Sequence, residues 1–310
     1  MNRSDPIIAL AKRFPPLTRA FLWLWCRISL LLGRNILDRR HWLIDYVADI
    51  VQYRIPVMTR LGNGMKVKVH LHDHVGGKII RFGYYEPDEV RLVQSLLKPG
   101  MTFIDIGAHI GQYALVGSEQ VGDTGAVHAF EPDPETYRWL RSNIERNGLR
   151  NITTNQMALA GEPGTLQFYI SKINDIGSNS LREPRRFSGQ VHDVRCIPLD
   201  DYLREHGIEK VDLIKMDVEG AEHAVFQGAK SLLGGANPPI LMVEFEETRQ
   251  QIFDFSCAEL AAELEGYGYV LFIIEEGRLV PHRPRPDLYS YNVMAVPRDR
   301  VDEVRVFIEE

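Results

Sequence analysis

The stretch Phe103-Ile-Asp-Ile-Gly-Ala-His-Ile-Gly111 decides the fold that this sequence predicts. It lies within a short apolar run from Met101 to Ile106, which is typical of a buried central strand, and it ends in a loop with two glycines. Gly107 and Gly111 allow the backbone to approach a ligand closely, and the N-terminus of a following helix would supply N–H donors to an anionic group. The stretch therefore predicts a ligand-binding strand–loop–helix turn.

The strand-then-helix pattern repeats from residue 100 onward, which predicts an α/β fold with a largely parallel sheet. Asp133 and Pro134 form an N-cap and first-turn pair, and Gly148 can end the helix that they begin. The predicted strands are 101–106, 125–130, 211–216, 240–243, 269–274 and 289–296, and the other predicted helices are 88–97, 222–233 and 256–267.

Carboxylates stand at or just beyond the carboxyl ends of four predicted strands. They are Asp105, Glu131, Asp217 and Glu244. Open α/β sheets bind their ligands at this edge. Acids also open helices as caps, so one of them alone would mean little. Four at equivalent positions favour a shared, negatively charged ligand site.

The glycine spacing separates two classes of cofactor. A dinucleotide fingerprint needs G-x-G-x-x-G, whereas this loop has Gly107, three other residues and then Gly111. Glu131 follows Gly111 by 20 residues, the interval at which an acid can accept both hydroxyls of an adenosine ribose. The acid spacing suits either class, and the glycine spacing disfavours a nicotinamide or flavin enzyme.

These motifs resemble the class I S-adenosylmethionine-dependent methyltransferases, and more closely the FkbM family within that class. The resemblance covers roughly residues 75 to 250. It rests on Gly83-Tyr-Tyr-Glu-Pro87, on the loop 103–111, on Phe130-Glu-Pro132 and on Lys215-Met-Asp-Val-Glu-Gly-Ala-Glu222. The last motif is the most specific of the four.

The resemblance implies a Rossmann-like, seven-stranded, mostly parallel sheet with helices on both faces and an antiparallel last strand. It also implies S-adenosylmethionine as the cofactor. The residues that it assigns to cofactor binding are Glu86, Asp105, Gly107, Ala108, His109, Gly111, Glu131, Pro132, Met157, Ala158 and Asp217. Glu131 would hold the ribose, Met157 and Ala158 would flank the adenine, and His109 stands where the family often has Asn.

Methyl transfer to a hydroxyl also needs a group that takes the proton. Asp217 is the first candidate for this base or for orienting the acceptor, and Glu222 and Glu244 are the second; His223 is expected to be an ordinary helix residue. An alternative, not favoured, is that several carboxylates hold a divalent cation such as Mg²⁺. The place where N-methylating enzymes resemble one another in an Asn/Asp-Pro-Pro-aromatic motif reads Asp217-Val-Glu-Gly220, so we expect O-methylation.

The stretch 171–193 is predicted to be a long polar loop that contacts the acceptor, with a solvated surface loop as the equal alternative. Ser178, Ser180 and Glu219 are the residues expected to contact the substrate. His70, His72 and His74 alternate on a predicted strand that ends at Gly76 and Gly77, and we expect them to be surface residues rather than metal ligands.

Composition limits the function further. The 310 residues are 45% hydrophobic and 25% charged, as in an ordinary globular protein, and the net charge of −6 argues against a general nucleic-acid binder. Three scattered cysteines, Cys26, Cys196 and Cys257, predict neither a disulfide framework nor a zinc site, so a reducing, cytoplasmic location is expected. No cleavable signal peptide is predicted.

The charge is unevenly distributed. Residues 1–60 hold ten basic and four acidic residues, a net +6, and the other 26 basic and 38 acidic residues give −12. Residues 17–34 predict an amphipathic helix with Arg19, Arg27 and Arg34 on one side and Trp, Phe and Leu opposite; its longest uncharged run is too short to span a bilayer. This helix could contact the inner face of an anionic membrane peripherally, or it could dock on the body of the protein or on a partner; the sequence leaves both interpretations open.

We therefore expect two regions: a basic, Trp-rich helical extension over 1–60 and a methyltransferase domain over 61–310 with its core at 100–296. The expected function is S-adenosylmethionine-dependent O-methylation of a hydroxyl on a glycan, lipid-linked sugar or secondary metabolite. Two alternatives remain open: a dinucleotide- or nucleotide-sugar-dependent oxidoreductase, and a non-catalytic, membrane-recruited binding module. The sequence does not indicate the oligomeric state.

Overall fold

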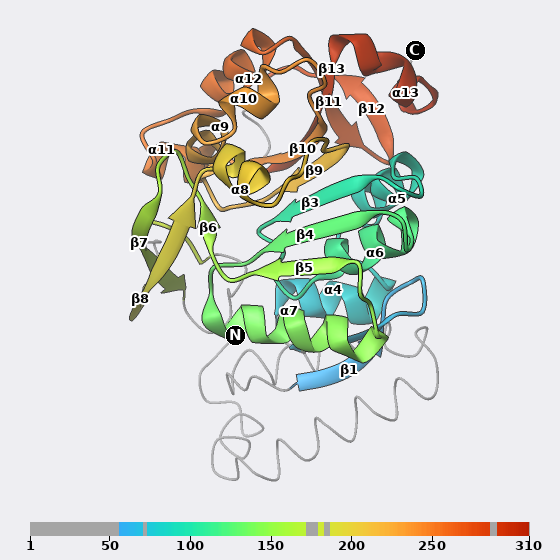
Figure 1. Cartoon of the computed structure of the whole chain (residues 1–310), viewed down its shortest axis with the longest axis vertical. Coiled ribbons are helices and arrows are strands. Elements are labelled where there is room, and N and C mark those ends of the chain that lie inside the picture. The colour runs from blue at the N-terminus through green and yellow to red at the C-terminus, as the bar shows by residue number, and fades with distance from the viewer. Residues whose placement is uncertain (1–55, 71–72, 172–178, 183–186, 286–289, 310) are drawn as a thin grey trace, which may run out of the picture. The chain divides into compact units, whose positions relative to one another are not determined.

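The computed structural model describes residues 56–70, 73–171, 179–182, 187–285 and 290–309 (Figure 1). The chain divides into two compact units, whose described parts are residues 56–87 and the remainder from Asp88 onward. The predicted amphipathic helix over 17–34 lies outside the described residues. Within the described part of the chain, no helix is long and apolar enough to cross a membrane.

The smaller unit is a two-stranded antiparallel sheet with one helix. Strands β1 (Pro56–Arg60) and β2 (Lys66–His70) pair directly, and helix α4 spans His74–Phe82. The predicted strand through His74 to Gly77 is therefore wrong. The Asp73 carboxylate accepts a hydrogen bond from the Gly76 N–H and begins a helix there. Gly76 is needed because a Cβ at this position would lie 2.1 Å from the His70 carbonyl oxygen.

The larger unit is built on an eight-stranded sheet in the order β12-β11-β13-β10-β9-β3-β4-β5. Its strands are β3 (Thr102–Ile106), β4 (Ala126–Phe130), β5 (Ile152–Asn155), β9 (Leu213–Met216), β10 (Ile240–Phe245), β11 (Tyr269–Glu275), β12 (Arg278–Pro281) and β13 (Tyr291–Pro297). The five strands from β10 to β5 are parallel, and β13 runs antiparallel to both of its neighbours. The predicted mostly parallel sheet and antiparallel last strand are confirmed. The count is eight rather than seven because β12 folds back on β11 as an edge strand.

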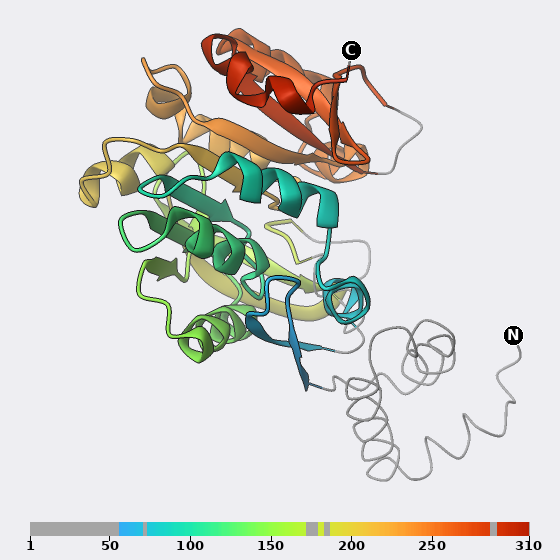
Figure 2. The same ribbon diagram turned by 90° about the vertical axis from the view of Figure 1, so that its right-hand side faces the viewer.

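Helices lie on both faces of the sheet (Figures 1 and 2). Helix α6 packs on one face, where a Cβ on Gly117 would lie 2.4 Å from the Phe103 ring. The described helices of this unit are α5 (Pro87–Leu96), α6 (Gln112–Val121), α7 (Pro134–Asn147), α8 (Leu199–Glu205), α9 (Glu222–Gln227), α10 (Lys230–Leu233), α11 (Glu247–Ile252), α12 (Cys257–Gly266) and α13 (Val301–Val304), with single 3-10 turns at Arg298–Arg300 and Arg305–Phe307. The predicted cap of α7 is confirmed, because Asp133 accepts from the Thr136 N–H and Gly148 ends the helix in a left-handed conformation.

The single helix predicted over 222–233 is wrong. The structure has two short helices, α9 and α10, separated at Gly228. This glycine lies against the backbone of Ala160, whose carbonyl oxygen would be 2.2 Å from an added Cβ. The Asp200 carboxylate accepts hydrogen bonds from the Ser231 and Leu232 N–H groups and so begins α10 anew.

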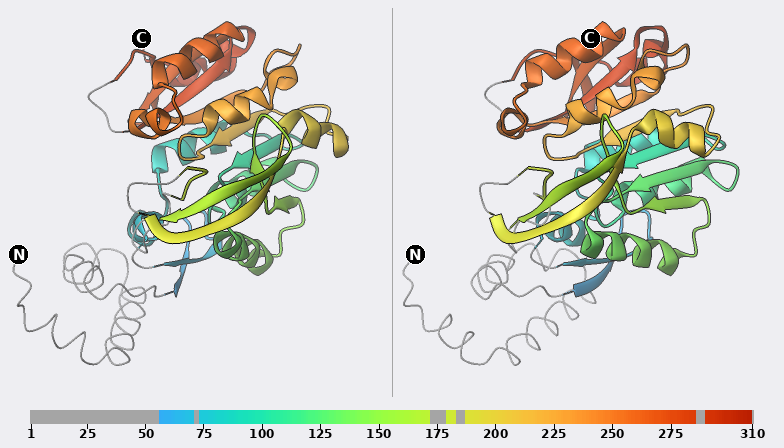
Figure 3. Two further views of the ribbon diagram at one scale, coloured as in Figure 1. Left: turned by 90° about the vertical axis from the view of Figure 1, so that its left-hand side faces the viewer. Right: turned by 60° about the vertical axis from the view of Figure 1, so that its left-hand side comes forward.

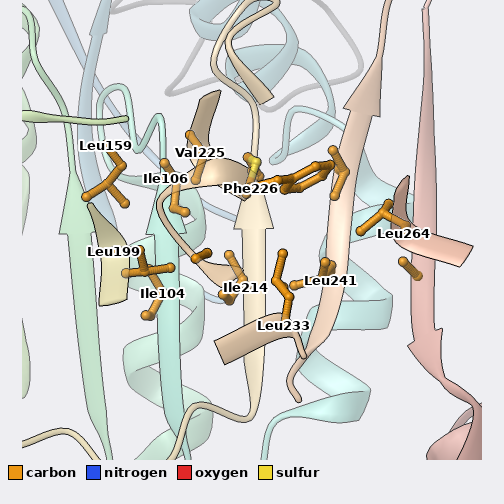
Figure 4. Packing of buried hydrophobic residues seen from close by; sticks show 14 of the residues in the cluster. Ile104, Ile106, Leu159, Leu199, Ile214, Val225, Phe226, Leu233, Leu241 and Leu264 are labelled. Atoms are coloured by element: carbon orange, nitrogen blue, oxygen red, sulfur yellow. The ribbon is translucent and has the colours of Figure 1, made fainter. Parts of the chain in front are cut away.

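The largest described core lies between the sheet and the helices α8, α9, α10 and α12. Figure 4 shows Ile104 and Ile106 of β3, Ile214 of β9 and Leu241 of β10 pointing toward the side chains of these helices. All four are at most 1% exposed. Because alternate residues of a strand point to opposite faces, Asp105 and Lys215 point away from this core, toward the face covered by α6.

A long antiparallel arm follows β5 (Figure 3). Strands β7 (Gly164–Ser171) and β8 (Phe187–Ile197) form it, and short β6 (Ala158–Leu159) pairs beside β8. The expectation of a continuous loop over 171–193 is therefore wrong, because β8 already begins at Phe187. One face of the arm buries Phe168, Ile170, Val194 and Cys196 while residues of the other face are exposed, so the arm lacks the continuous apolar run of a fully buried strand.

We expect Ser256→Ala to lower the stability of the protein by about 1 kcal/mol, because it removes an N-cap. The Ser256 hydroxyl accepts from the Glu259 N–H at 3.2 Å and thereby caps α12. Thermal denaturation monitored by circular dichroism measures the change. Ser231→Ala, on an exposed position of α10, is the matched control. Equal melting temperatures of the two variants would contradict the capping role.

Candidate functional site

The structure brings the four strand-end carboxylates to one edge of the sheet. Asp105 is the penultimate residue of β3, Glu131 directly follows β4, Asp217 directly follows β9 and Glu244 lies near the end of β10. These four strands are parallel neighbours, so their carboxyl ends coincide. The predicted gathering of acids at this edge follows from the observed topology.

The glycine loop after β3 lies directly against the loop after β9. Gly107 has φ +78°, and a Cβ there would lie 1.8 Å from the Asp217 carbonyl oxygen. The N–H groups of Gly107 and Ala108 both donate to the Phe130 carbonyl, at 3.0 and 2.9 Å. Gly111 has φ +94° and packs on Leu140 of α7. Both glycines are therefore required by geometry, and the loop is anchored to two neighbouring strand ends.

Glu131 ties the same loop to the start of α7. One of its carboxylate oxygens accepts from the His109 N–H at 3.0 Å, and the other accepts from the Asp133 N–H at 2.9 Å. Burial raises the pKa of this carboxyl to about 8, against weaker opposition from these two hydrogen bonds. Pro132 is half-buried between Glu131 and Asp133. His109 itself has φ +50°, an uncommon conformation for a residue with a side chain.

A compact group of charges lies beneath the loop. Asp105 is fully buried, and neither of its oxygens has a partner in normal hydrogen-bond geometry among the described residues. Burial raises its pKa to about 6, although the Lys215 ammonium and the Ala114 N–H favour its charged form. The Lys215 Nζ lies 2.9 Å from Asp217 Oδ2 and 5.0 Å from the centre of the Tyr113 ring.

Asp217 is the more accessible acid of this group, with a quarter of its side chain exposed. Burial alone would raise its pKa, but the Lys215 ammonium and hydrogen bonds from Lys215 and Glu244 lower it overall. Asp217 is therefore ionised at neutral pH. The Ser290 hydroxyl donates to Glu244 at 3.1 Å and helps to hold that residue at the end of β10.

The loop from Asp217 to Ala221 is held from below by Glu222. This residue is 1% exposed, and its oxygens accept from the Val218 N–H at 3.1 Å and from the Gln250 side chain. Burial raises its pKa to about 7. These contacts place Glu222 under the loop rather than at its surface.

Glu219 and Gly220 adopt consecutive left-handed conformations, with φ +58° and +100°. The Arg249 Nε lies 2.9 Å from Glu219 and 3.3 Å from Glu246, and burial raises the pKa of Glu219 well above its usual range. Gly220 lies against the backbone of Arg249 and the ring of Phe253. Helix α11 therefore sets the shape of the Asp217 loop.

The structure also brings together two of the residues expected to contact substrate. The Ser180 hydroxyl donates to the Glu219 carbonyl at 3.1 Å, which joins the segment between β7 and β8 to the Asp217 loop. Arg182 extends this attachment, because its guanidinium donates to the Ile252 carbonyl at 2.8 Å and pairs with Asp254 at 3.0 Å. Ser178 lies outside the described residues.

The remaining cofactor-binding candidates lie in different places. Met157 lies just after β5 and packs against the core, and Ala158 begins β6. Both therefore follow the end of β5, the strand next to β4 and Glu131. Glu86 has φ +48° and belongs to the smaller unit, so its role in the site stays a prediction. His223 pairs with Glu263 at 2.7 Å and stacks on Phe255, and so links α9 to α12.

Three contributors had no role in the sequence-based prediction. Lys215 stands within the specific motif, and a lysine inside an apolar strand was a signal of an internal charge partner. Arg249 and Gln250 gave no such signal, because they reach the Asp217 loop from a helix about 30 residues away. Among the described residues, no group of three or more His, Cys, Asp or Glu side chains is arranged to hold a metal ion.

A mostly parallel sheet with the antiparallel strand β13 between β10 and β11, a glycine loop after β3 and acids at the carboxyl edge together define an α/β domain of the methyltransferase class. A family model described as the methyltransferase FkbM domain matches residues 105–271, more than half of the chain. The chain therefore belongs to the FkbM methyltransferase family.

Three characterised relatives show the range of similarity. The 2-O-methyltransferase NoeI of Sinorhizobium fredii is 32% identical over 46% of this chain and 63% of its own length. The 31-O-demethyl-FK506 methyltransferase FkbM of Streptomyces tacrolimicus is 27% identical over 68% and 88%. The hexuronic acid methyltransferase AglP of Haloferax volcanii is 26% identical over 49% and 59%. The matches to NoeI and AglP thus span less than two thirds of those proteins.

We expect Gly107→Ala to destabilise the protein by more than about 2 kcal/mol, because a left-handed φ and a backbone clash act together. Thermal denaturation measures the loss. Gly122→Ala is the matched control, because Gly122 has φ +63° but nothing within 4 Å of an added Cβ. A Gly107 variant no less stable than the Gly122 variant would contradict the close contact between the two loops.

The raised pKa of Glu131 predicts a pH dependence of stability. Between its usual value of 4.5 and about 8, the native carboxyl keeps a proton that the unfolded chain has lost, so the free energy of unfolding should fall as pH rises. In Glu131→Gln this decline should be shallower. Melting temperatures measured from pH 5 to pH 8 test it, and parallel curves for the two proteins would show that Glu131 does not titrate there.

Proposed function

We propose that this chain transfers a methyl group from S-adenosylmethionine to a hydroxyl of a glycan, a lipid-linked sugar or a secondary metabolite. The observation that carries the proposal is the contact of the Gly107 loop with the Asp217 loop. This contact sets the family's cofactor-binding motif beside an ionised carboxylate at the carboxyl edge of the sheet. The family match supports the reaction class.

The residues present fit the cofactor. Gly107 and Gly111 leave no room for a side chain, so at these two positions the loop can offer only backbone groups to a ligand. Asp105 offers two buried oxygens without partners in normal hydrogen-bond geometry beneath that loop. A site lined with carboxylates at this edge of the sheet suits a cationic ligand. S-adenosylmethionine supplies an activated methyl group on a sulfonium cation, which the acceptor oxygen attacks in line.

Each assigned residue then has a physical task. Glu131 accepts the ribose hydroxyls, because its carboxyl already reaches across from the end of β4 to the glycine loop. Asp105 favours the ammonium of the methionine moiety, and Met157 and Ala158 contact the adenine beyond β5. Ala108, His109 and Pro132 shape the backbone around these groups. Holding reactants in a fixed orientation accounts for much of the rate that such a site can produce.

The acceptor lies on the side of Asp217. Its carboxylate is ionised and partly exposed, so it can orient an acceptor hydroxyl and receive its proton. Glu244 contacts Asp217 and is the second group for this proton. Glu222 acts as a positioning residue, because its oxygens are buried beneath the loop and already bonded to Val218 and Gln250.

The substrate class rests on the relatives and on the arm. NoeI is named a 2-O-methyltransferase, AglP a hexuronic acid methyltransferase, and FkbM a methyltransferase of 31-O-demethyl-FK506. In this chain the segment around Ser180 borders the Asp217 loop, where hydroxyl and carboxyl groups can hydrogen-bond a polyhydroxylated acceptor. We propose a small-molecule or glycan acceptor, without nucleic acid as partner.

Calorimetric titration tests the reaction class. We expect S-adenosylhomocysteine to bind and NAD not to bind. Binding of NAD alone would support the oxidoreductase alternative, and binding of neither would support a non-catalytic module. Methyl transfer from labelled S-adenosylmethionine to extracted metabolites and glycans identifies the acceptor. Transfer that persists in EDTA would exclude a divalent cation.

Two substitutions separate binding from turnover. Glu131→Ala should weaken the affinity for S-adenosylhomocysteine at least about tenfold, because it removes the carboxyl that hydrogen-bonds to the ribose. Asp217→Asn should lower kcat by about 10² to 10⁴ with little effect on that affinity, because S-adenosylhomocysteine carries no sulfonium charge. Calorimetry and initial rates measure the two effects. Wild-type affinity in the Glu131 variant would refute its ribose role.

Peripheral membrane contact through residues 17–34 remains part of the proposal, and with it a place at the inner face of a membrane. The support is the sequence pattern of Arg19 and Arg27 beside Trp23 and Trp25. In co-sedimentation with phosphatidylserine-containing vesicles, replacing both tryptophans by alanine should reduce binding. Neutral phosphatidylcholine vesicles are the control. Equal sedimentation of variant and parent protein would count against membrane contact.

A further inference from the structure

Lys215 is a buried lysine within an apolar strand. Its side chain is 5% exposed, and its neighbours along β9, Ile214 and Met216, belong to the core on the opposite face. A lysine in such a place is costly unless its charge is compensated. The groups that compensate the charge of Lys215 therefore indicate its role.

The Lys215 ammonium is compensated by groups of the proposed site. Its Nζ lies 2.9 Å from Asp217 Oδ2 and 5.0 Å from the centre of the Tyr113 ring, a cation–π distance. In the sheet, Lys215 is directly paired in register with Asp105 of β3. The Lys215 ammonium therefore lies between Asp105, beneath the glycine loop, and Asp217, at the acceptor side.

The other groups that act on Asp217 are mostly acidic. They come from five elements: Asp105 from β3, His109 from the glycine loop, Glu244 from β10, Glu219 from the Asp217 loop and Glu222 from α9. Without an adjacent cation, a carboxylate among four other acids would take up a proton. Lys215 is the lysine that contacts Asp217 directly.

We propose that Lys215 is a positioning residue that keeps Asp217 ionised and aimed at the reacting sulfur. The permanent negative charge of Asp217 stabilises the cationic sulfonium of the substrate. It gives no comparable stabilisation to the neutral thioether of the product. This inference rests on the proposed function, and it adds a basis for preferring S-adenosylmethionine over S-adenosylhomocysteine.

The segment just before β9 contains a matched control. Lys210 and Asp212 form a second lysine–aspartate pair with the same spacing, 2.5 Å apart, at the opposite end of β9. Lys210 is 66% exposed and lies at the amino edge of the sheet, away from the proposed site. Lys210→Met removes a lysine charge near the same strand without touching the proposed machinery.

The test is the ratio of two dissociation constants, that of S-adenosylhomocysteine over that of S-adenosylmethionine, measured by calorimetry from pH 6 to pH 9. Asp105 and Glu131 titrate in every variant, so the comparison with Lys210→Met isolates the effect of Lys215. In Lys215→Met, Asp217 should take up a proton at low pH, and the ratio should fall about tenfold between pH 9 and pH 6 relative to the control. Lys215→Arg should restore the profile of the control.

Three results would overturn the inference. One is a Lys215→Met profile that follows that of Lys210→Met. Another is a uniform loss of affinity at all pH values that Lys215→Arg does not repair, which would indicate a purely structural lysine. The third is a ratio in Asp217→Asn that equals the wild-type ratio, because Asp217 would then not distinguish the sulfonium.

A second measurement does not depend on cofactor binding. In Lys215→Met the unpaired Asp217 should make the melting temperature fall more steeply from pH 5 to pH 8 than in Lys210→Met, because burial of its charge is no longer compensated. Adding Asp217→Asn should remove this additional fall and recover stability. If Lys215→Met does not fold, the double variant should still fold, and its failure to do so would also overturn the inference.

The two hypotheses fail in different ways. If the wild-type protein binds neither S-adenosylmethionine nor S-adenosylhomocysteine, the proposed function is wrong. If the wild-type protein binds both and the Lys215 variants behave as the Lys210 control, the function stands and the role of Lys215 is refuted.

Discussion

The close approach of Gly107 to the carbonyl of Asp217 is the constraint on which the proposed site depends. It joins the loops that leave β3 and β9, two neighbouring strands of the sheet. A side chain at position 107 would separate them, and the glycine loop and the acceptor-side carboxylate would no longer share one edge. The hydrogen bonds from Gly107 and Ala108 to Phe130 extend the same arrangement to β4. Backbone contact, rather than side-chain chemistry, therefore assembles this edge.

Charge burial is the second constraint, and it has opposite effects at neighbouring acids. Burial raises the pKa of Asp105 and Glu131, whereas Lys215 and Glu244 lower that of Asp217. Carboxyls at the ends of neighbouring strands therefore differ in protonation near neutral pH. Such divergence is common where acids of one type serve different tasks. Arg249 and Glu222 in addition hold the Asp217 loop in a strained backbone conformation.

Several features were predictable because they depend on short-range chemistry. The cap at Asp133, the stop at Gly148 and the positions of the central strands follow from local residue type and spacing, and the structure confirms them. The two errors have different causes. The break at Gly228 depends on contact with Ala160 and on capping by Asp200, which are distant in sequence, so nothing in the local pattern indicates it. The helix at His74 begins at a local cap, Asp73, which the sequence-based prediction did not use.

The sequence by itself determined the α/β class, the acids at the strand ends and the two glycines of the loop, because strand periodicity and left-handed backbone positions are local properties of the chain. The tertiary structure alone decided which acids are ionised and which residues hold them. Lys215 contacts Asp217 two residues further along the chain, at the end of the same strand. Arg249, Gln250 and Ser180, in contrast, reach the Asp217 loop from distant segments. A pKa depends on burial and on every nearby charge, and only folding places those charges.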